Sequence, residues 1–366
     1  MQPMDRTHRP QRTHPMLPTH LMHSTHPRHH HQRGQTRTRD RGLRALLVIT
    51  SLLLLPLRTP AQEPWPTKPV RLIAPFAPGG STDVAARMVA TQLSQTLGQQ
   101  FVVDNRAGAG GIIGMEAAAK AAPDGYTLVI GSLSTTVLAA ARSVPLPFDP
   151  ARDLRPVAMI VSIPLMIAAT PGMNATSFSE FANLLKSKPG TYTLASAGQG
   201  TSGHIIGEYL AATLKTKIAA AHYRGAAPVL PDLIAGRTHF TVNPPALLGE
   251  YVANGRLTGV VILSKNRSKL VPNVPTLNEV NLTGFVGHEW GSWNGLFAPA
   301  ATPAAIVERL NRETNAVLTT PAINQRLTEL GFEVLGDYTI ATARDFIKAQ
   351  FDHWLPVVKA TGVKLD

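Results

Sequence analysis

The sequence contains no cysteine among its 366 residues. Disulfide bonds, thiolate metal sites and catalysis by a thiol are therefore excluded. This absence is compatible with export from the cytoplasm but does not establish it. The apolar run Ala45–Leu57 has about 13 residues, too few for a membrane span, which needs about 20.

Familiar catalytic signatures are also missing. The chain has no G-x-S-x-G elbow, no H-E-x-x-H motif and no pair of closely spaced acids within a loop. His204 follows Ser202 by two residues, but side chains two apart at a helix start do not face each other. We therefore predict no catalytic residue. An exported α/β enzyme that uses His204 or His222 on a carboxylated substrate is the alternative.

Positive charge is concentrated at the N-terminus. The net charge is +12, and residues 1–61 contribute +8 through ten Arg, no Lys and two Asp, so that 12 − 8 leaves +4 for the remainder. That remainder has no long Lys/Arg run interleaved with aromatics, so we exclude a nucleic-acid partner. A hydrophobic content of 44% fits a soluble globular protein once a targeting segment is set aside.

Residues 1–44 form an extension rich in His and Arg, with eight of the thirteen histidines before Gly34. A His-rich tract can bind metal, but no fold fixes a geometry here, and we predict no metal site. The extension is either disordered or lies upstream of the true translation start, and we favour the second interpretation.

A signal peptide follows. The basic flank Arg37–Arg44 precedes the apolar run, and residues 45–61 end in Thr59-Pro-Ala61, a small-residue exit. This layout is typical of Sec-dependent secretion, since no Arg-Arg pair indicates the twin-arginine route. We expect the mature chain to begin near Gln62 and to be periplasmic.

From Trp65 onward strands alternate with helices, which predicts an α/β fold with mainly parallel sheets. The first unit is a strand ending at Ala74, a turn from Phe76 through Pro78, Gly79 and Gly80, and a helix. Ser81 and Thr82 are good N-cap residues, and Asp83 lies where the helix dipole favours an acid. Such a strand–glycine turn–helix arrangement aims backbone N–H groups at an anion.

A second loop of the same construction runs from Ala197 to His204 and includes Gly198, Thr201 and Ser202. It formally matches G-x-G-x-x-G, a dinucleotide fingerprint, but no acid follows about 20 residues later for a ribose. We therefore interpret it as a second helix N-terminus that holds a carboxylate, and we predict no cofactor.

Other candidates have two readings. The loop Gly108–Gly114 is either a third anion-binding loop or structural, and we favour the second because it lacks a good N-cap and its glycines allow close backbone packing. Ser132 and Ser134 follow a strand, where they either contact a ligand or cap the next helix. Asn243 is a further polar residue at a strand end.

The segment Tyr223-Arg224-Gly225 also follows a strand. A Tyr O–H and an Arg fork suit a carboxylate, whereas the competing interpretation leaves Arg224 on the surface and packs Tyr223.

Seven motifs in order resemble the Bug family, the periplasmic solute receptors of tripartite tricarboxylate transporters. The resemblance covers nearly the whole chain from Pro69 to about Val363. The matching residues are Phe76–Asp83 (FAPGGSTD), Val103–Gly114 (VDNRAGAGGIIG), Pro123–Leu128 (PDGYTL), Ala195–His204 (ASAGQGTSGH), Tyr223–Pro228 (YRGAAP), Val274–Thr276 (VPT) and Gly295–Pro299 (GLFAP).

This resemblance implies a two-lobed periplasmic-binding-protein fold of type II-like form, with a ligand cleft between the lobes. Lobe 1 would comprise residues 62–165 and 285–366, and lobe 2 residues 166–284. The loops matching Pro78–Asp83 and Ala197–Ser202 hold a ligand carboxylate in this family, partly through bridging waters, and Tyr223–Gly225 lines the same cleft.

The chain departs from the family pattern in two places. Most relatives have Lys where Arg224 stands, and Arg can bind a carboxylate bidentately. Relatives usually show a Val-Asp pair near Thr238-His239 and often an Asp near Asn243, and losing an acid there changes what the far end of the ligand can be.

We therefore expect a monomeric, non-catalytic receptor that captures a small carboxylate solute, such as a di- or tricarboxylate, an amino acid or an aromatic acid. It would hand the solute to a membrane permease. A periplasmic sensor module that presents the same closed form to a signalling partner is a third reading.

Overall fold

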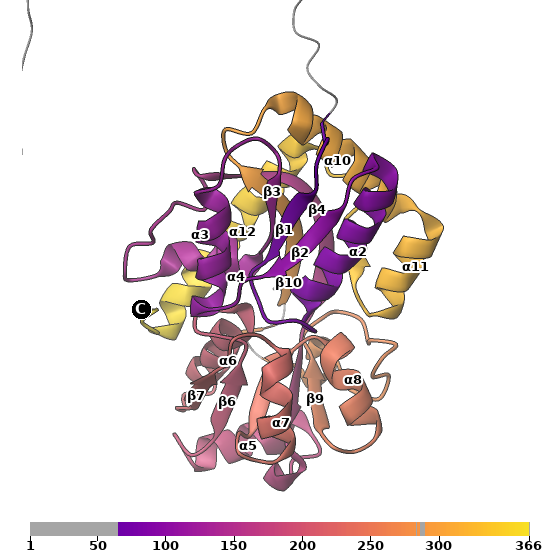
Figure 1. Cartoon of the computed structure of the whole chain (residues 1–366). Helices are drawn as coiled ribbons and strands as arrows, with labels where there is room; N and C mark the ends of the chain where they lie inside the picture. Colours follow the sequence, from indigo (N-terminus) through magenta and orange to yellow (C-terminus); the bar gives the residue numbers. More distant parts are fainter. Residues whose placement is uncertain (1–64, 283, 286–289, 366) are drawn as a thin grey trace, which may run out of the picture. The chain divides into compact units, whose positions relative to one another are not determined.

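The computed structural model describes residues 65–282, 284–285 and 290–365 (Figure 1). The described residues belong to one compact unit, Gln62–Asp366, which is separate from Met1–Ala61. The predicted N-terminal extension and signal peptide lie outside the described residues.

Two sheets organise this unit. The first has six strands in the order β11-β4-β10-β3-β1-β2. Its strands are β1 (Val70–Ala74), β2 (Phe101–Asn105), β3 (Thr127–Ser132), β4 (Leu154–Pro164), β10 (Gly291–Pro299) and β11 (Glu333–Val334). The second has the order β7-β6-β8-β5-β9. Its strands are β5 (Met166–Ala169), β6 (Thr193–Ser196), β7 (Ala219–His222), β8 (Phe240–Asn243) and β9 (Thr258–Ile262).

The strand pairing is mixed, so the prediction of mainly parallel sheets is wrong in this detail. Among the described strands, four neighbouring pairs are parallel and five are antiparallel. The βα units give the parallel pairs. The antiparallel pairs join β10 to β3 and β4, β11 to β4, and β5 to β8 and β9.

Helices flank both sheets and can be followed in Figure 1. They are α2 (Ser81–Leu97), α3 (Ile112–Ala119), α4 (Leu133–Thr136), α5 (Phe178–Ser187), α6 (Ser202–Thr213), α7 (Leu230–Ile234), α8 (Pro245–Ala253), α9 (Leu277–Val280), α10 (Ala304–Thr319), α11 (Pro321–Glu329) and α12 (Ile340–Thr361). Helices α2 and α3 contact β1, and α10 and α12 contact β4.

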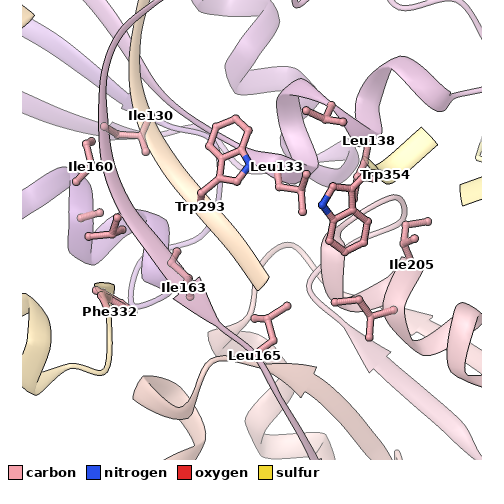
Figure 2. Packing of buried hydrophobic residues seen from close by; sticks show 14 of the residues in the cluster. Ile130, Leu133, Leu138, Ile160, Ile163, Leu165, Ile205, Trp293, Phe332 and Trp354 are labelled. Atoms are coloured by element: carbon pink, nitrogen blue, oxygen red, sulfur yellow. The ribbon is translucent and has the colours of Figure 1, made fainter. Parts of the chain in front are cut away.

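One hydrophobic core runs through the first sheet and continues into the second. Figure 2 shows Ile163 and Leu165 on either side of the point where the chain passes from β4 to β5. Trp354 of α12 and Ile205 of α6 belong to the same cluster and are buried. Helix α12, which follows the last strand of the first sheet, therefore also packs on α6 of the second. A separate cluster lies against the other face of the second sheet, where Met166 and Ala168 are buried.

Candidate functional site

A cavity lies between the two sheets, and the centres of water molecules can occupy about 60 Å³ of it. Room of that size holds about four to six ordered waters or the body of a small organic acid. None of the lining residues has an ionisable side chain. They are Phe76, Gly80, Ser81, Thr82, Ser132, Ser134, Ile163, Leu165, Ala197, Thr201, Ser202, Gly203, Ala226, Val242, Asn243, Pro244, Ser292 and Asn294.

Helix α2 points its N-terminus at this cavity. The N-cap is Gly80, and no side chain caps the helix. Ser81 and Thr82 were expected to cap, but they lie inside the first turn because the extended conformation falls on Gly80. Their side chains line the cavity instead. The N–H groups of a first helical turn have no partner within the helix, so this end can donate to an anion.

Asp83 anchors the loop that precedes α2. Its carboxylate accepts hydrogen bonds from the Gly79 N–H at 3.0 Å, Arg87 Nε at 3.0 Å and Asn105 Nδ2 at 2.9 Å. Burial alone would raise the pKa of Asp83, but these three bonds together hold it below the usual value. Asn105 Nδ2 also donates to the Phe76 carbonyl. Asp83 therefore faces its own loop and does not line the cavity.

Helix α6 brings the second N-terminus. Its N-cap is Thr201, whose hydroxyl donates to the Gly198 carbonyl at 2.7 Å and does not cap the helix. The Ser202 N–H donates to Ser134 Oγ at 2.9 Å, which joins the two sides of the cavity. Helix α2 thus offers an uncapped N-terminus to the cavity, and α6 offers the Gly203 N–H next to the Ser202 N–H that Ser134 accepts, an arrangement suited to a carboxylate.

Ser132 and Ser134 both line the cavity, and of the two Ser132 is the helix cap. Ser132 caps α4 in a capping box with Thr135, and it also lines the cavity. Ser134, in α4, accepts from α6 and lines the cavity beside it. Ser132 and Ser134 are 3% and 7% exposed, so water reaches them only through the cavity.

Strand β10 also lines the cavity, and the sequence analysis did not predict this contribution. Asn294 is 1% exposed, and its Nδ2 donates to Thr82 Oγ1 at 3.3 Å. Its Oδ1 is buried with no hydrogen-bond partner among the described residues. A register shift between Asn294 and Gly295 marks a bulge in the pairing with β4, a feature that re-aims side chains. The alternation of Ser292 and Asn294 along Gly291–Leu296 was the available signal, because residues two apart share a strand face.

Asn243 lies at the end of β8, as expected, and donates to Thr241 Oγ1 at 2.6 Å. It lines the cavity together with an apolar set. That set comprises Phe76, Ile163, Leu165, Val242 and Pro244. The cavity therefore has hydrogen-bond donors around one region and apolar surface around another.

The segment Tyr223–Gly225 lies beside the cavity loops but does not line the cavity. The Tyr223 hydroxyl donates to Asp232 Oδ2 at 2.5 Å, and burial with this bond raises the pKa of Tyr223 to about 12. The Arg224 side chain is exposed, while its carbonyl accepts from the Ala77 N–H at 3.1 Å. Gly225 has φ +146°, and a β-carbon there would lie 3.1 Å from the Ala77 nitrogen. This segment holds the α2 loop from the opposite side.

His204 and His222 also lie outside the lining of the cavity. His204 Nδ1 accepts from the Gly200 N–H at 3.1 Å, and its ring packs edge-on against His222 at 4.6 Å between centroids. Ser196 Oγ and His222 Nδ1 are 2.7 Å apart. Desolvation and the neighbouring His204 lower the pKa of His222. None of these side chains lines the cavity between the two sheets.

The structure brings about half of the sequence-predicted residues to the cavity. Those that line it are Phe76, Gly80, Ser81, Thr82, Ser132, Ala197, Thr201, Ser202 and Asn243. Those that lie behind or beside the wall are Pro78, Gly79, Asp83, Gly198, His204, Tyr223, Arg224 and Gly225.

The structural interpretation of the loop Gly108–Gly114 is confirmed. A β-carbon at Gly110 would meet the Gln199 carbonyl, and one at Gly114 would lie 2.7 Å from Pro75. Gly198 is close on the other side, 3.2 Å from Gly110 by the same measure. Glycine at these positions lets the loop before α3 pack against the loop before α6.

Comparison with known proteins gives a consistent result. Residues 85–363 match the family model described as the tripartite tricarboxylate transporter family receptor. The protein BugT of Bordetella pertussis is 34% identical over 325 residues, which cover 87% of this chain and 96% of BugT.

Two solved structures are similar along the described unit. The periplasmic binding protein BugD is 30% identical with a TM-score of 0.77, covering 82% of this chain and 99% of that one. MatC from Rhodopseudomonas palustris, solved with bound malate, is 32% identical with a TM-score of 0.76, covering 80% of this chain and 100% of that one. The predicted periplasmic-binding-protein fold is therefore confirmed, with mixed sheets.

Proposed function

Because the chain belongs to the tripartite tricarboxylate transporter receptor family, we propose that it captures a small organic carboxylate in the cavity between its two sheets. One observation carries this proposal. The N-termini of two helices, α2 and α6, meet at one cavity, and no ionisable side chain lines it. Such a space attracts an anion through backbone N–H groups and helix dipoles.

The bound carboxylate accepts from the first-turn N–H groups of both helices and from the hydroxyls beside them. Ser81 and Thr82 of α2 and Gly203 and the Ser202 hydroxyl of α6 supply these groups, with Thr201 and Ser132 beside them, while the Ser202 N–H stays with Ser134. Bridging waters complete the contacts, as the cavity has room for several. The ligand body then lies along the apolar set and reaches Asn243 and β10.

The predicted residues that do not line the cavity hold the loops that precede α2 and α6. Asp83 and Gly79 hold the turn before α2, and the Arg224 carbonyl and Gly225 hold it from the opposite side. His204 fixes the Gly200 peptide at the start of α6. These groups place the donors at the spacing that a carboxylate needs, although their own side chains do not line the cavity.

Capture closes two lobes about a hinge. Lobe 1 comprises residues 62–165 and 285–366, and lobe 2 comprises residues 166–284. The β4-to-β5 connection near Leu165 forms part of the hinge, and the Leu263 N–H donates to the Leu165 carbonyl there. The Ser202–Ser134 and Ala77–Arg224 bonds are made in the closed form.

The receptor works as an exported monomer that delivers its solute to a membrane permease and turns nothing over. Export uses the signal peptide that ends near Ala61, and the mature chain acts in the periplasm. Among the described residues, no helix combines the length and apolar character needed to span a bilayer.

A ligand screen of the chain from Gln62 tests the proposal. Malate, succinate and adipate are compared with their diamides by thermal shift and calorimetry. An acid at about 100 times its Kd adds about 2.7 kcal/mol of stability, whereas its amide adds none. Stabilisation by a sugar or nucleotide and by no acid contradicts the proposal.

The same samples separate a receptor from an enzyme. NMR spectra of the acid are recorded after long incubation with the protein. A receptor returns the acid unchanged at one equivalent bound, and any new product signal favours the enzyme alternative.

A further inference from the structure

A second cavity opens on the first sheet, away from the cavity between the two sheets, which we call the cleft. Its volume is about 620 Å³, within the range of small-molecule sites. It is lined by α4, β4, β10, α12 and the segment before β4. The lining residues are Thr136, Pro150, Ala151, Arg152, Leu154, Arg155, Pro156, Phe297, Ala300, Arg344, Ile347, Lys348 and Phe351. It shares none of them with the cleft.

Part of the lining of this cavity is apolar. Leu154 and Phe297 come from the sheet and are buried, while Ile347 and Phe351 come from α12. Ile347 and Phe351 are four residues apart and therefore lie on the same helix face. A ligand body of aliphatic or aromatic carbon can be buried against this wall.

Cationic side chains are interleaved with these apolar residues in the lining. Arg344 and Lys348 flank the apolar residues on α12, and Arg152 and Arg155 approach from the segment around the start of β4. Arg152 pairs with Asp153 and Lys348 with Asp352, but neither acid lines the cavity. The lining therefore has four cationic side chains and no acidic one.

Two buried donors in the lining have no partner among the described residues. Thr136 is 2% exposed, and its Oγ1 makes no hydrogen bond. Arg155 Nη1 donates to the Thr302 carbonyl, but its buried Nε is also unpartnered. Leaving such a group unsatisfied is costly, and because both atoms are sealed from solvent, a ligand oxygen reaches them only after a small side-chain shift. A carboxylate oxygen accepts from both an Arg N–H and a hydroxyl.

We propose that this cavity is a second binding site for an amphipathic organic monoanion, a carboxylate that carries an apolar chain or ring. The carboxylate lies toward Arg155 and the other cations, and the carbon body packs on Leu154, Ile347 and Phe351. The proposal does not depend on what the cleft binds.

Octanoate is the probe, titrated by calorimetry into the folded chain from Gln62. Octanoate binds saturably at this site, and octan-1-ol and octylamine bind at least about tenfold more weakly because they lack the anion. Arg155→Gln and Phe351→Ser each weaken octanoate binding by about tenfold or more and leave binding of the cleft acid unchanged.

Two control variants locate the site. Asn294→Asp changes the cleft and leaves octanoate binding unchanged. Lys359→Gln removes an exposed charge from the same helix outside the cavity, and octanoate binding is retained. The proposal is overturned if octanoate does not saturate, if octan-1-ol binds as tightly, or if both cavity variants keep full affinity. It is equally overturned if Lys359→Gln weakens octanoate as much as they do, or if Asn294→Asp abolishes its binding.

Discussion

Replacing Asn294 by Asp adds a negative charge to the cavity between the two sheets without changing the shape of the cavity. The side chain is 1% exposed and lines a cavity in which no ionisable side chain takes part. Its contact with Thr82 survives the exchange, because the Thr82 hydroxyl can donate to the new carboxylate. The variant therefore reports on the charge of the ligand and on little else.

The magnitude follows from Coulomb's law. Two like charges about 6 Å apart at an effective dielectric constant of about 20 repel by about 2.8 kcal/mol, which weakens an acid about 100-fold. Burial without a cation raises the pKa of the introduced Asp, so the loss of affinity grows as the pH rises and that side chain ionises.

Calorimetry of the wild type and Asn294→Asp with the best-binding acid of the panel, between pH 5 and pH 9, measures this effect. The variant's Kd should rise with pH while that of the wild type stays flat above the pKa of the acid. Asn266→Asp, an exposed position outside the cavity, is the matched control. If Asn294→Asp binds the acid as tightly as the wild type at pH 9, the anion is not held beside α2 and β10.

Three further predictions concern Ser134, Asp83 and His239. Ser134→Ala leaves the Ser202 N–H without its partner in the closed form, which costs about 1–3 kcal/mol and weakens the acid by about 5- to 150-fold in calorimetry. Asp83→Asn lowers the free energy of unfolding in urea at pH 7. Because the folded pKa of Asp83 is depressed, its contribution is complete above the unfolded pKa of about 3.9 and disappears as the pH falls through the folded value. His239 accepts from the Thr193 N–H, and burial depresses the pKa of its ring. Stability is therefore lost as the pH falls from about 6.5 through the folded pKa, and His239→Gln flattens that slope in pH-dependent melts.

The parts of the fold that could be predicted from the sequence are those set by local pattern. The first βα unit was found because an apolar run, a glycine turn and a helical period follow one another within about 25 residues. The strand β10 was not found, since its partners β3 and β4 lie more than a hundred residues earlier in the chain. Its antiparallel direction follows from how the chain returns between the sheets, which no short window of sequence contains.

In the candidate site, too, the parts set by local sequence pattern could be predicted and the parts set by distant strands could not. The N-termini of α2 and α6 were predictable because glycine and hydroxyl residues mark a helix start. Asn294 was not, because it reaches the cavity through a bulge in a distant strand. Tyr223 illustrates the opposite case. Its hydroxyl suited a ligand on local grounds, but Asp232, nine residues later, takes it.

The absence of a cation from the cleft has a physical consequence for release. A buried Arg would hold a carboxylate firmly, but it would be an unpaired charge whenever the closed cavity was empty, and such a charge is strongly unfavourable in a space without water. Helix N-termini carry only partial charges, which first-turn waters can satisfy. Binding by dipoles therefore keeps the closed form accessible without a ligand, so that affinity is set by the small difference between waters and carboxylate. A receptor that must give up its solute needs that difference to be small.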